Sequence, residues 1–394
     1  MTAITLFGLL FLLLVAGVPI AVALGLSTSV AILLFTHEPT LLIAQKLFIS
    51  LDKFALMAIP LFVLMGNFLS QGGAAQRIIR FARALVGHLP GGLPMSAIFA
   101  CVIFAAVSGS SPATVAAIGS IMMGAIKEDG YSSAFSVGSI VSSGSLGIIM
   151  PPSIILIVYG VTVDQSIGKL FMAGVLPAFF LGGLLMLVTY IAARRGGHKR
   201  KPMAPASEIW ASFKDASWGL FVIVIVIGGI YGGIFTPTEA AAVSAAYAFF
   251  AVKFIYRDLS WKQIPQVIKT SAATAAMIMF IIANAMIFAH LLTTEQMPQD
   301  LANWIISLNL NVYMFLIFLN LLLLLAGNFM EPSSLIMILA PLIFPIAMEL
   351  GIDPIHLGVI ITVNMEIGML TPPVGLNLFV ASGISGLTVQ ETIR

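Results

Sequence analysis

Charged residues are scarce in this chain. Asp, Glu, Lys and Arg make up 9% of its 394 residues, whereas a soluble domain carries about 25%. Hydrophobic residues reach 60% and the mean hydropathy is +1.09. A soluble fold of this composition would have too little polar surface to stay dispersed. The scarcity of charge therefore predicts an integral membrane protein.

Several other features are missing. The single cysteine, Cys101, lies in an apolar run, which excludes a disulfide framework and a cysteine-based metal site. Residues 1–7 lack the basic stretch and the cleavage site of a signal peptide, so the first hydrophobic segment is expected to remain as a span. Long alternating strands are absent, which disfavours an outer-membrane barrel. These absences together favour an all-α polytopic membrane protein.

Four interruptions break the hydrophobic runs. Two are clusters of small and polar residues around a proline, at 108–115 and 327–334. About 40 residues after each cluster comes a double proline, Pro151-Pro152 and Pro372-Pro373. The runs beside the clusters are of only about 14 residues, against the roughly 20 that a membrane-spanning helix needs. Each cluster is therefore expected to form the tip of a re-entrant helical hairpin, and each double proline a broken helix.

The interruptions repeat along the chain. Pro112 and Pro332 are 220 residues apart, Pro151 and Pro372 are 221 apart, and Pro19 and Pro237 are 218 apart. The spacing predicts a first repeat at 1–193, a polar linker at 194–217, and a second repeat at 218–394. The hairpins are expected near 93–126 and near 311–346. Internal repeats of this kind are typical of secondary transporters.

The basic residues predict the orientation. With a cytoplasmic N-terminus and two hairpins, only Lys46, Lys53 and Lys169 fall outside, and Arg394 is terminal, so fourteen of the eighteen Lys and Arg residues lie inside. The two hairpins then enter from opposite faces, and the repeats are inverted. The first repeat ends in a span at 169–193, whose partner would begin near residue 390. One final span is therefore expected to be missing from the second repeat.

The four interruptions indicate a central binding site. Non-helical backbone is tolerated inside a bilayer only where it is buried in protein or faces a water-filled cavity. Proline suits the first turn of a half-helix, and free amides at such a turn favour an anionic group. Carbonyls freed at Ser108, Gly147, Gly327 and Gly368 favour a small hard cation such as Na⁺. The competing interpretation is that the breaks only bend packed helices.

Glu331 is the one carboxylate at a hairpin tip. It could balance a cation, take up a proton, organise water and hydroxyls around a substrate, or simply cap the half-helix that follows. Glu366, just before the second double proline, could brace that break. An intramembrane hydrolase using Ser110 or Ser111 is disfavoured, because every histidine lies at or near a predicted loop. No ATP-binding or nucleic-acid motif occurs, and no enzyme activity or cofactor is expected.

Five segments together resemble one family, the large membrane subunit of TRAP (tripartite ATP-independent periplasmic) transporters, the DctM-like proteins. The resemblance covers essentially the whole chain, and its most specific pieces are residues 108–119, 147–154, 235–242, 327–333 and 364–377. Glutamate at position 331 resembles the C4-dicarboxylate branch, whereas members that carry sialic acid tend to have aspartate there. The absent last span departs from the family pattern.

The resemblance implies a Na⁺-driven elevator in a bacterial inner membrane, with Na⁺ as the coupling ion. The implied partners are a small four-helix membrane subunit and a periplasmic solute-binding protein, and the implied substrate is an organic anion. The implied substrate residues are Ser110, Thr114, Ser145, Asn328, Glu331, Ser333 and Asn377. The implied Na⁺ residues are Ser108, Ser111, Gly147, Met150 and Pro151 at one site, and Gly327, Gly368, Thr371 and Val374 at the other. A proton-coupled carrier that uses Glu331 is the alternative within transport.

Overall fold

The structure is a computed structural model, and it describes residues 2–36, 39, 41–197, 201–307, 311–372 and 375–393, with the backbone alone at 302 and 304–307. All regular elements in these residues are helical. The first half contains α1 (Thr2–Val15), α2 (Ile20–Phe35), α3 (Leu41–Leu51), η1 (Phe54–Met57), α4 (Ala58–Gln71), α5 (Ala74–Val86), α6 (Gly92–Ser108), α7 (Ser111–Glu128), α8 (Ser133–Gly144), η2 (Ser145–Ile148), α9 (Ile154–Thr162) and α10 (Ile167–Arg195).

The second half contains α11 (Ala206–Ile223), η3 (Val224–Gly228), α12 (Gly229–Tyr231), α13 (Pro237–Phe250), η4 (Ala251–Tyr256), α14 (Ile264–Thr294), α15 (Met297–Ser307), α16 (Val312–Gly327), α17 (Pro332–Glu349), α18 (Pro354–Gly368), α19 (Leu376–Ser385) and α20 (Val389–Ile393). Six of the helical stretches in the described ranges are long and apolar enough to cross a membrane. The all-helical membrane fold predicted from composition is thus confirmed.

The order of helices in the second half follows that of the first. The hairpin α6–α7 corresponds to α16–α17, the interrupted pair α8–α9 to α18–α19, and the amphipathic α5 to α15. One pair differs, because α3 and α4 are separate helices whereas α14 is continuous over 31 residues. The chain leaves helical geometry at Asp52 and Lys53, where the side chain of Lys53 donates to the carbonyl of Val161 at 3.2 Å.

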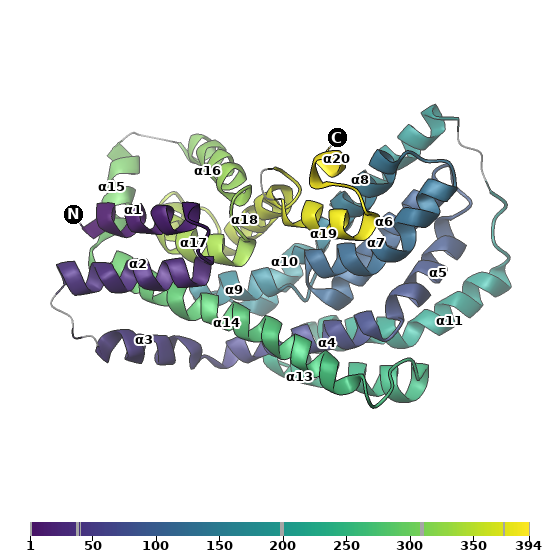
Figure 1. The fold of residues 1–394 in the computed structure, drawn as a ribbon, viewed down its shortest axis with the longest axis horizontal. Helices are drawn as coiled ribbons and strands as arrows, with labels where there is room; N and C mark the ends of the chain where they lie inside the picture. Colours follow the sequence, from purple (N-terminus) through teal and green to yellow (C-terminus); the bar gives the residue numbers. More distant parts are fainter. Residues whose placement is uncertain are drawn as a thin grey trace.

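The two halves are interleaved (Figure 1). The first-half helix α4 packs on the second-half helix α13, and the second-half helix α14 packs in the same way on α2. The pattern recurs at the hairpins, where α7 packs on α19 and α17 packs on α9. In each case one repeat supplies the element that buries the apolar face of the other, as expected for two halves related by an approximate two-fold axis.

The long helix α10 shows which way the first hairpin is inserted. Gly91, just before α6, lies so close to the end of α10 that an added Cβ would be 2.9 Å from Ala193. Asp129, just after α7, pairs at 2.5 Å with Lys201, which follows the end of α10. Both ends of this hairpin therefore lie beside the C-terminal end of α10, so the hairpin enters and leaves on one side.

The second hairpin is based at the other end of α10. It ends where α17 meets α18, and the carbonyl of Pro354 in the first turn of α18 accepts a hydrogen bond from Tyr159 at 2.7 Å. Gly358, one turn later, lies so close to Leu170 in the first turns of α10 that an added Cβ would be 2.8 Å from it. The two hairpins thus enter from opposite ends of the same spanning helix, which agrees with the inverted arrangement predicted from the basic residues.

Two predicted lengths differ from the structure. The hairpin helices α6, α7, α16 and α17 have 17, 18, 16 and 18 residues, longer than the 14 or so expected. Helices α7 and α17 are longer because a proline begins each of them inside the polar cluster, and α6 and α16 are longer because they extend to Ser108 and Gly327, the first residues of the clusters. Residues 206–217, predicted as linker, form the start of α11, because acidic residues on this stretch pair with arginines of α5.

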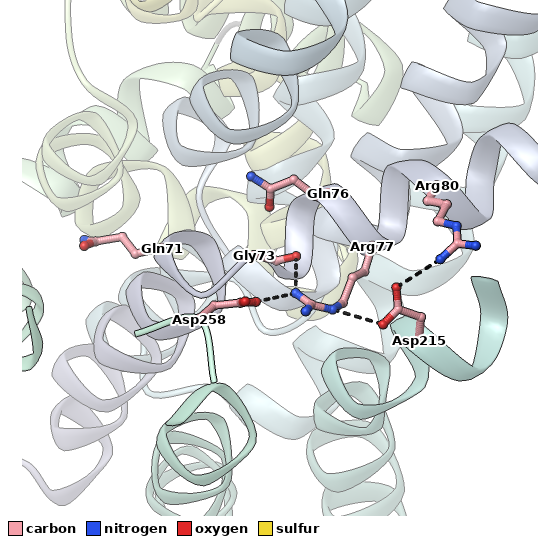
Figure 2. A pocket seen from close by; sticks show the side chains of 7 residues that line it. All are labelled: Gln71, Gly73, Gln76, Arg77, Arg80, Asp215 and Asp258. Carbon is pink, nitrogen blue, oxygen red and sulfur yellow. Dashed lines mark hydrogen bonds and ion pairs between the residues drawn. The ribbon is translucent and has the colours of Figure 1, made fainter. Parts of the chain in front are cut away.

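The arginine face of α5 is held by acidic residues of the second half (Figure 2). The guanidinium of Arg77 lies between Asp215 of α11, at 3.2 Å, and Asp258 after η4, at 2.5 Å. It also lies 3.9 Å from the centre of the Tyr256 ring. Arg80 pairs with Glu208 at 3.0 Å. Four polar residues far apart in the chain therefore fix α5 on the side that the basic residues predict to be cytoplasmic.

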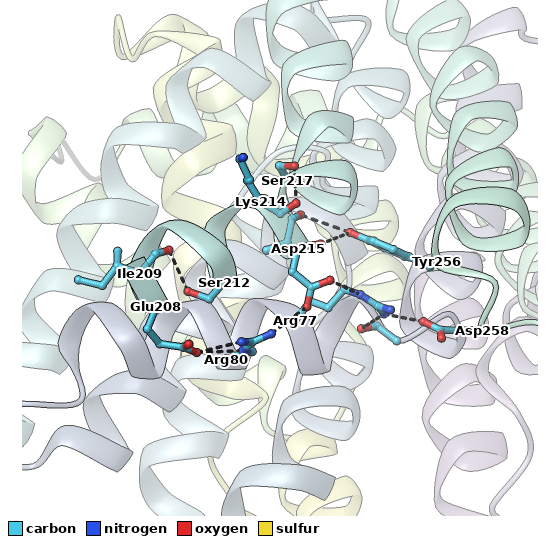
Figure 3. Close-up of polar contacts among 12 residues, drawn as sticks. Arg77, Arg80, Glu208, Ile209, Ser212, Lys214, Asp215, Ser217, Tyr256 and Asp258 are labelled. Atoms are coloured by element: carbon cyan, nitrogen blue, oxygen red, sulfur yellow. Dashed lines mark hydrogen bonds and ion pairs between the residues drawn. The ribbon is translucent and has the colours of Figure 1, made fainter. Parts of the chain in front are cut away.

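Tyr256, two residues before Asp258, binds the backbone of α11 beside Asp215 (Figure 3). Its hydroxyl donates to the carbonyl of Asp215 at 3.0 Å and accepts from the amide of Gly219 at 2.7 Å. Burial lowers the pKa of Arg77, but the hydrogen bond and charge of Asp258 and the charge of Asp215 raise it above its ordinary value. Arg77 consequently stays charged at every accessible pH.

We expect Arg77→Ala to lower the free energy of unfolding by about 1–2 kcal/mol, because two partly exposed carboxylates lose their shared cation and the Tyr256 ring loses its cation–π contact. Arg83→Ala is the matched control. Arg83 is an exposed residue of the same helix and forms no ion pair within the described ranges, so its loss should cost less than about 0.5 kcal/mol. Thermal unfolding in detergent measures both, and equal midpoints for the two variants would contradict the assigned role of Arg77.

Candidate functional site

The tip of the first hairpin is a two-residue turn. Helix α6 ends at Ser108, Gly109 has a φ of +61°, and α7 begins at Ser111 with Pro112 in its first turn. A side chain at Gly109 could not fit, because a Cβ there would be 2.2 Å from the carbonyl oxygen of Pro152. In the sequence Ser-Gly-Ser-Ser-Pro, the glycine thus allows the positive φ and the close backbone contact, and the proline suits the first turn of α7.

Hydroxyl groups bind the backbone inside this tip. The hydroxyls of Ser108 and Thr114 are 2.7 Å apart, and that of Thr114 donates to the carbonyl of Ser110 at 2.9 Å. Thr114 is fully buried. No side chain caps α7 at Ser110, so the first amides of α7 keep their positive end open.

The tip of the second hairpin is capped by an acid. Glu331 is the N-cap of α17, and one of its carboxylate oxygens accepts from the amide and the hydroxyl of Ser334, both at 3.1 Å. The other oxygen accepts from Ser333 at 2.6 Å. This geometry agrees with the capping interpretation of Glu331, while its place beside a cavity leaves its other predicted roles as proposals.

A cavity of about 400 Å³ lies between the two tips. Five of the predicted residues line it, namely Ser108, Ser110, Ser111, Glu331 and Ser333. The central helices complete its wall with Asn67 of α4 and Thr274 of α14, which sequence reasoning missed. An amide within an otherwise apolar span is the signal that could have indicated Asn67, whose side chain donates to Ser271 of α14 at 2.9 Å.

In each repeat the hairpin tip touches the interrupted helix of the same repeat. A Cβ added at Gly147 would be 2.7 Å from the backbone of Ser110, and one added at Gly368 would be 2.8 Å from the backbone of Gly327. These contacts bring together the predicted Na⁺ residues Ser111 with Gly147, and Gly327 with Gly368. Both places present hard oxygen atoms from carbonyls or hydroxyls, the donor type that suits Na⁺.

The remaining predicted site residues occupy different surroundings. Met150 and Pro151 are buried just after η2, and Thr371 donates to the carbonyl of its own helix at Ile367. Asn328 is half-buried at the end of α16, and Val374 lies outside the described residues.

Two predicted substrate residues contact the opposite repeat instead of the cavity. Asn377 is fully buried, and its amide nitrogen donates to the hydroxyl of Ser111 at 2.7 Å. Ser145 donates to a carboxylate oxygen of Glu366 at 2.8 Å and is almost fully buried. Neither residue lines the cavity in this conformation.

Comparison with known proteins identifies the family of this chain. Residues 7–394 match the family described as "Tripartite ATP-independent periplasmic transporter, DctM component". The chain belongs to the DctM family. It is 49% identical to the C4-dicarboxylate TRAP transporter large permease protein of Rhodobacter capsulatus, over 99% of this chain and 92% of the relative. It is 54% identical to the protein of the same name from Pseudomonas aeruginosa, over 94% of this chain and 87% of the relative.

More distant relatives extend the range of solutes in the family. The sialic acid TRAP transporter large permease protein of Vibrio cholerae is 36% identical over 98% of this chain and 90% of the relative. Two solved transporters share the fold with a TM-score of 0.59 over 89% of this chain, YdaH of Alcanivorax borkumensis at 14% identity, over 82% of that chain, and MtrF of Neisseria gonorrhoeae at 13% identity, over 79%. The large-permease assignment made from the motifs is therefore confirmed.

The close backbone approaches predict a glycine requirement. We expect Gly147→Ala and Gly368→Ala each to cost about 1–3 kcal/mol of unfolding free energy, because the added methyl meets backbone that cannot move aside. Gly138→Ala in α8 is the control, since nothing lies within 4 Å of its added Cβ. It should stabilise the helix by about 0.5–1 kcal/mol. Thermal unfolding decides, and a Gly147 variant as stable as the Gly138 variant would refute the contact.

Proposed function

We propose that this large TRAP permease imports an organic anion, a C4-dicarboxylate such as succinate, driven by an inward Na⁺ gradient. The observation that carries the proposal is the cavity of about 400 Å³ between the two hairpin tips. Its polar lining consists of hydroxyls, the amide of Asn67, the carboxylate of Glu331 and one open helix start, and apolar side chains form the rest of its wall. Among the described residues no histidine lines it, so no nucleophile–histidine pair supports hydrolysis there.

The two tips have different parts in this proposal. The uncapped start of α7 at Ser110 and Ser111 offers amides and a positive dipole end to a carboxylate of the substrate. At the equivalent start of α17, Glu331 already binds the amide of Ser334 and puts a carboxylate where the anion would lie. We therefore assign the substrate anion to the first tip. Glu331 holds the second tip in shape and keeps a second anion away from it.

Coupling to Na⁺ is supported by the two places where a tip touches an interrupted helix. Each gathers backbone oxygens within a buried region, at Ser110 beside Gly147 and at Gly327 beside Gly368. A Na⁺ ion at either place would hold the hairpin tip against the interrupted helix of the same repeat and so complete the wall of the cavity. Ion binding would thereby favour substrate binding through a shared conformation.

The arrangement of helices supports an elevator movement. The hairpins pack with α8, α9, α18 and α19, while α2, α4, α13 and α14 pack on one another. We assign the first set to the mobile part and the second to the scaffold, joined by the arm helices α5 and α15. The small membrane subunit, the periplasmic binding protein and the inner-membrane location with a cytoplasmic N-terminus belong to this proposal.

The dependence of uptake on Na⁺ is tested in proteoliposomes. They contain this chain with its small membrane subunit, and the solute-binding protein is added outside. We expect succinate to accumulate against its gradient under an inward Na⁺ gradient and not under an equal K⁺ gradient. The control is the same vesicles with equal Na⁺ on both sides. Uptake that is unchanged when K⁺ replaces Na⁺ would refute the proposal.

The proton-coupled alternative gives a separate test at Glu331. Because glutamine retains a carbonyl oxygen that can cap α17, we expect Glu331→Gln to keep Na⁺-driven uptake within about fivefold of the native rate. Glu128→Gln, at the exposed end of α7, is the control. If a pH gradient alone drives uptake by the native chain and Glu331→Gln abolishes it, the proton-coupled reading replaces ours.

A further inference from the structure

Ser145 and Glu366 are equivalent positions of the two repeats. They are 221 residues apart, the same offset that relates the two double prolines. The hydroxyl of Ser145 donates to a carboxylate oxygen of Glu366 at 2.8 Å. Two residues related by a two-fold axis can touch only where they meet on that axis. The hydrogen bond between Ser145 and Glu366 therefore marks the pseudo-two-fold axis of the molecule.

The pair is also buried. Ser145 is 1% exposed and Glu366 is 5% exposed. The second carboxylate oxygen of Glu366 has no hydrogen-bond partner within the described residues. Burying a carboxyl group in an apolar region costs free energy of desolvation. Two apolar side chains at these positions would hold the helices together without that cost. The polar pair must therefore contribute something that apolar packing does not, and a directional bond is what it supplies.

Each member of the pair lies two residues before the glycine that touches a hairpin tip. Ser145 precedes Gly147, which lies against the backbone of Ser110, and Glu366 precedes Gly368, which lies against Gly327. The hydrogen bond between Ser145 and Glu366 consequently connects the tip–helix contact of the first repeat to the tip–helix contact of the second repeat. Within the described residues, no other hydrogen bond joins equivalent positions of the two interrupted helices.

We propose that Ser145 and Glu366 are a positioning pair that sets the two interrupted helices relative to each other, so that both tip–break contacts form together. The proposal rests on the proposed Na⁺ coupling, because those contacts are where Na⁺ is assigned. It gives Ser145 a role through Glu366 and not through substrate. A hydrogen bond in a low-dielectric interior is strong and directional, so this pair fixes the register of the two helices as well as their distance.

The test compares single variants with an exchange of the two residues. In the proteoliposome assay at saturating succinate, we expect Ser145→Ala and Glu366→Ala each to raise the Na⁺ concentration for half-maximal uptake about tenfold or more. Glu366→Gln, which keeps an acceptor for the serine hydroxyl, should stay within about threefold of the native value. The half-saturating succinate concentration at saturating Na⁺ should not change.

The exchange variant S145E/E366S uses the symmetry directly. Because the positions are related by the axis, the exchanged pair has the same summed volume and can make the same bond in the reverse sense. We expect it to recover at least half of the Na⁺ affinity that either alanine variant loses. Thr362→Val is the matched control, since Thr362 is buried on the same helix and bonds only its own backbone at Gly358. It should leave the Na⁺ dependence unchanged.

The outcomes separate this inference from the proposed function. If the native chain shows no Na⁺-driven uptake, the proposed function fails. If the native chain is Na⁺-driven but the alanine variants keep its Na⁺ dependence and lose only thermal stability, the positioning role is refuted. An exchange variant no better than the alanine variants, or a glutamine variant as impaired as alanine, also refutes it.

Discussion

Backbone polar groups that leave helical geometry inside an apolar medium must find partners within the protein. Most of the interrupted backbone at the centre of this permease has such partners, and the uncapped start of α7 is the exception. Hydroxyl side chains bind carbonyls in the first tip, a glutamate binds the amide and hydroxyls at the second, and Ser153 caps α9 through the amide of Leu156. Glycine stands wherever one stretch of backbone must touch another. Both hairpin tips are held near the centre of the molecule, and the space left between them is the cavity.

The repeat, the two hairpins and the interrupted helices could be predicted from the sequence, because prolines, glycines and small polar residues act locally on the backbone. The partners of polar side chains could not. The spacing of three between Arg77, Arg80 and Arg83 places them on one face of α5, but nothing local in the sequence indicates that Asp215 and Asp258 bind Arg77. The same holds for Asn377 beside Ser111. Such pairs depend on how distant helices pack, which a single sequence does not display.

The approximate symmetry also shows where the halves have diverged. Ser111 and Glu331 occupy equivalent helix starts, 220 residues apart, yet one start is open and the other is capped. A strictly symmetric pair of tips would present the substrate with the same charge on both sides. In the proposed function, this difference gives the substrate anion one open helix start to bind and so would orient it within a pseudo-symmetric cavity.

The interleaving of the halves has a consequence for how the chain is made. Because α4 packs on α13 and α2 packs on α14, several helices of the first half have no permanent neighbours until the second half has been synthesised. Until then, lipid covers the faces of these helices that will later pack against protein. Contacts between residues so far apart in the chain form late in folding. The final structure is therefore assembled by docking two inserted halves, and a ribosome that stops early leaves a membrane-embedded fragment with its interfaces open.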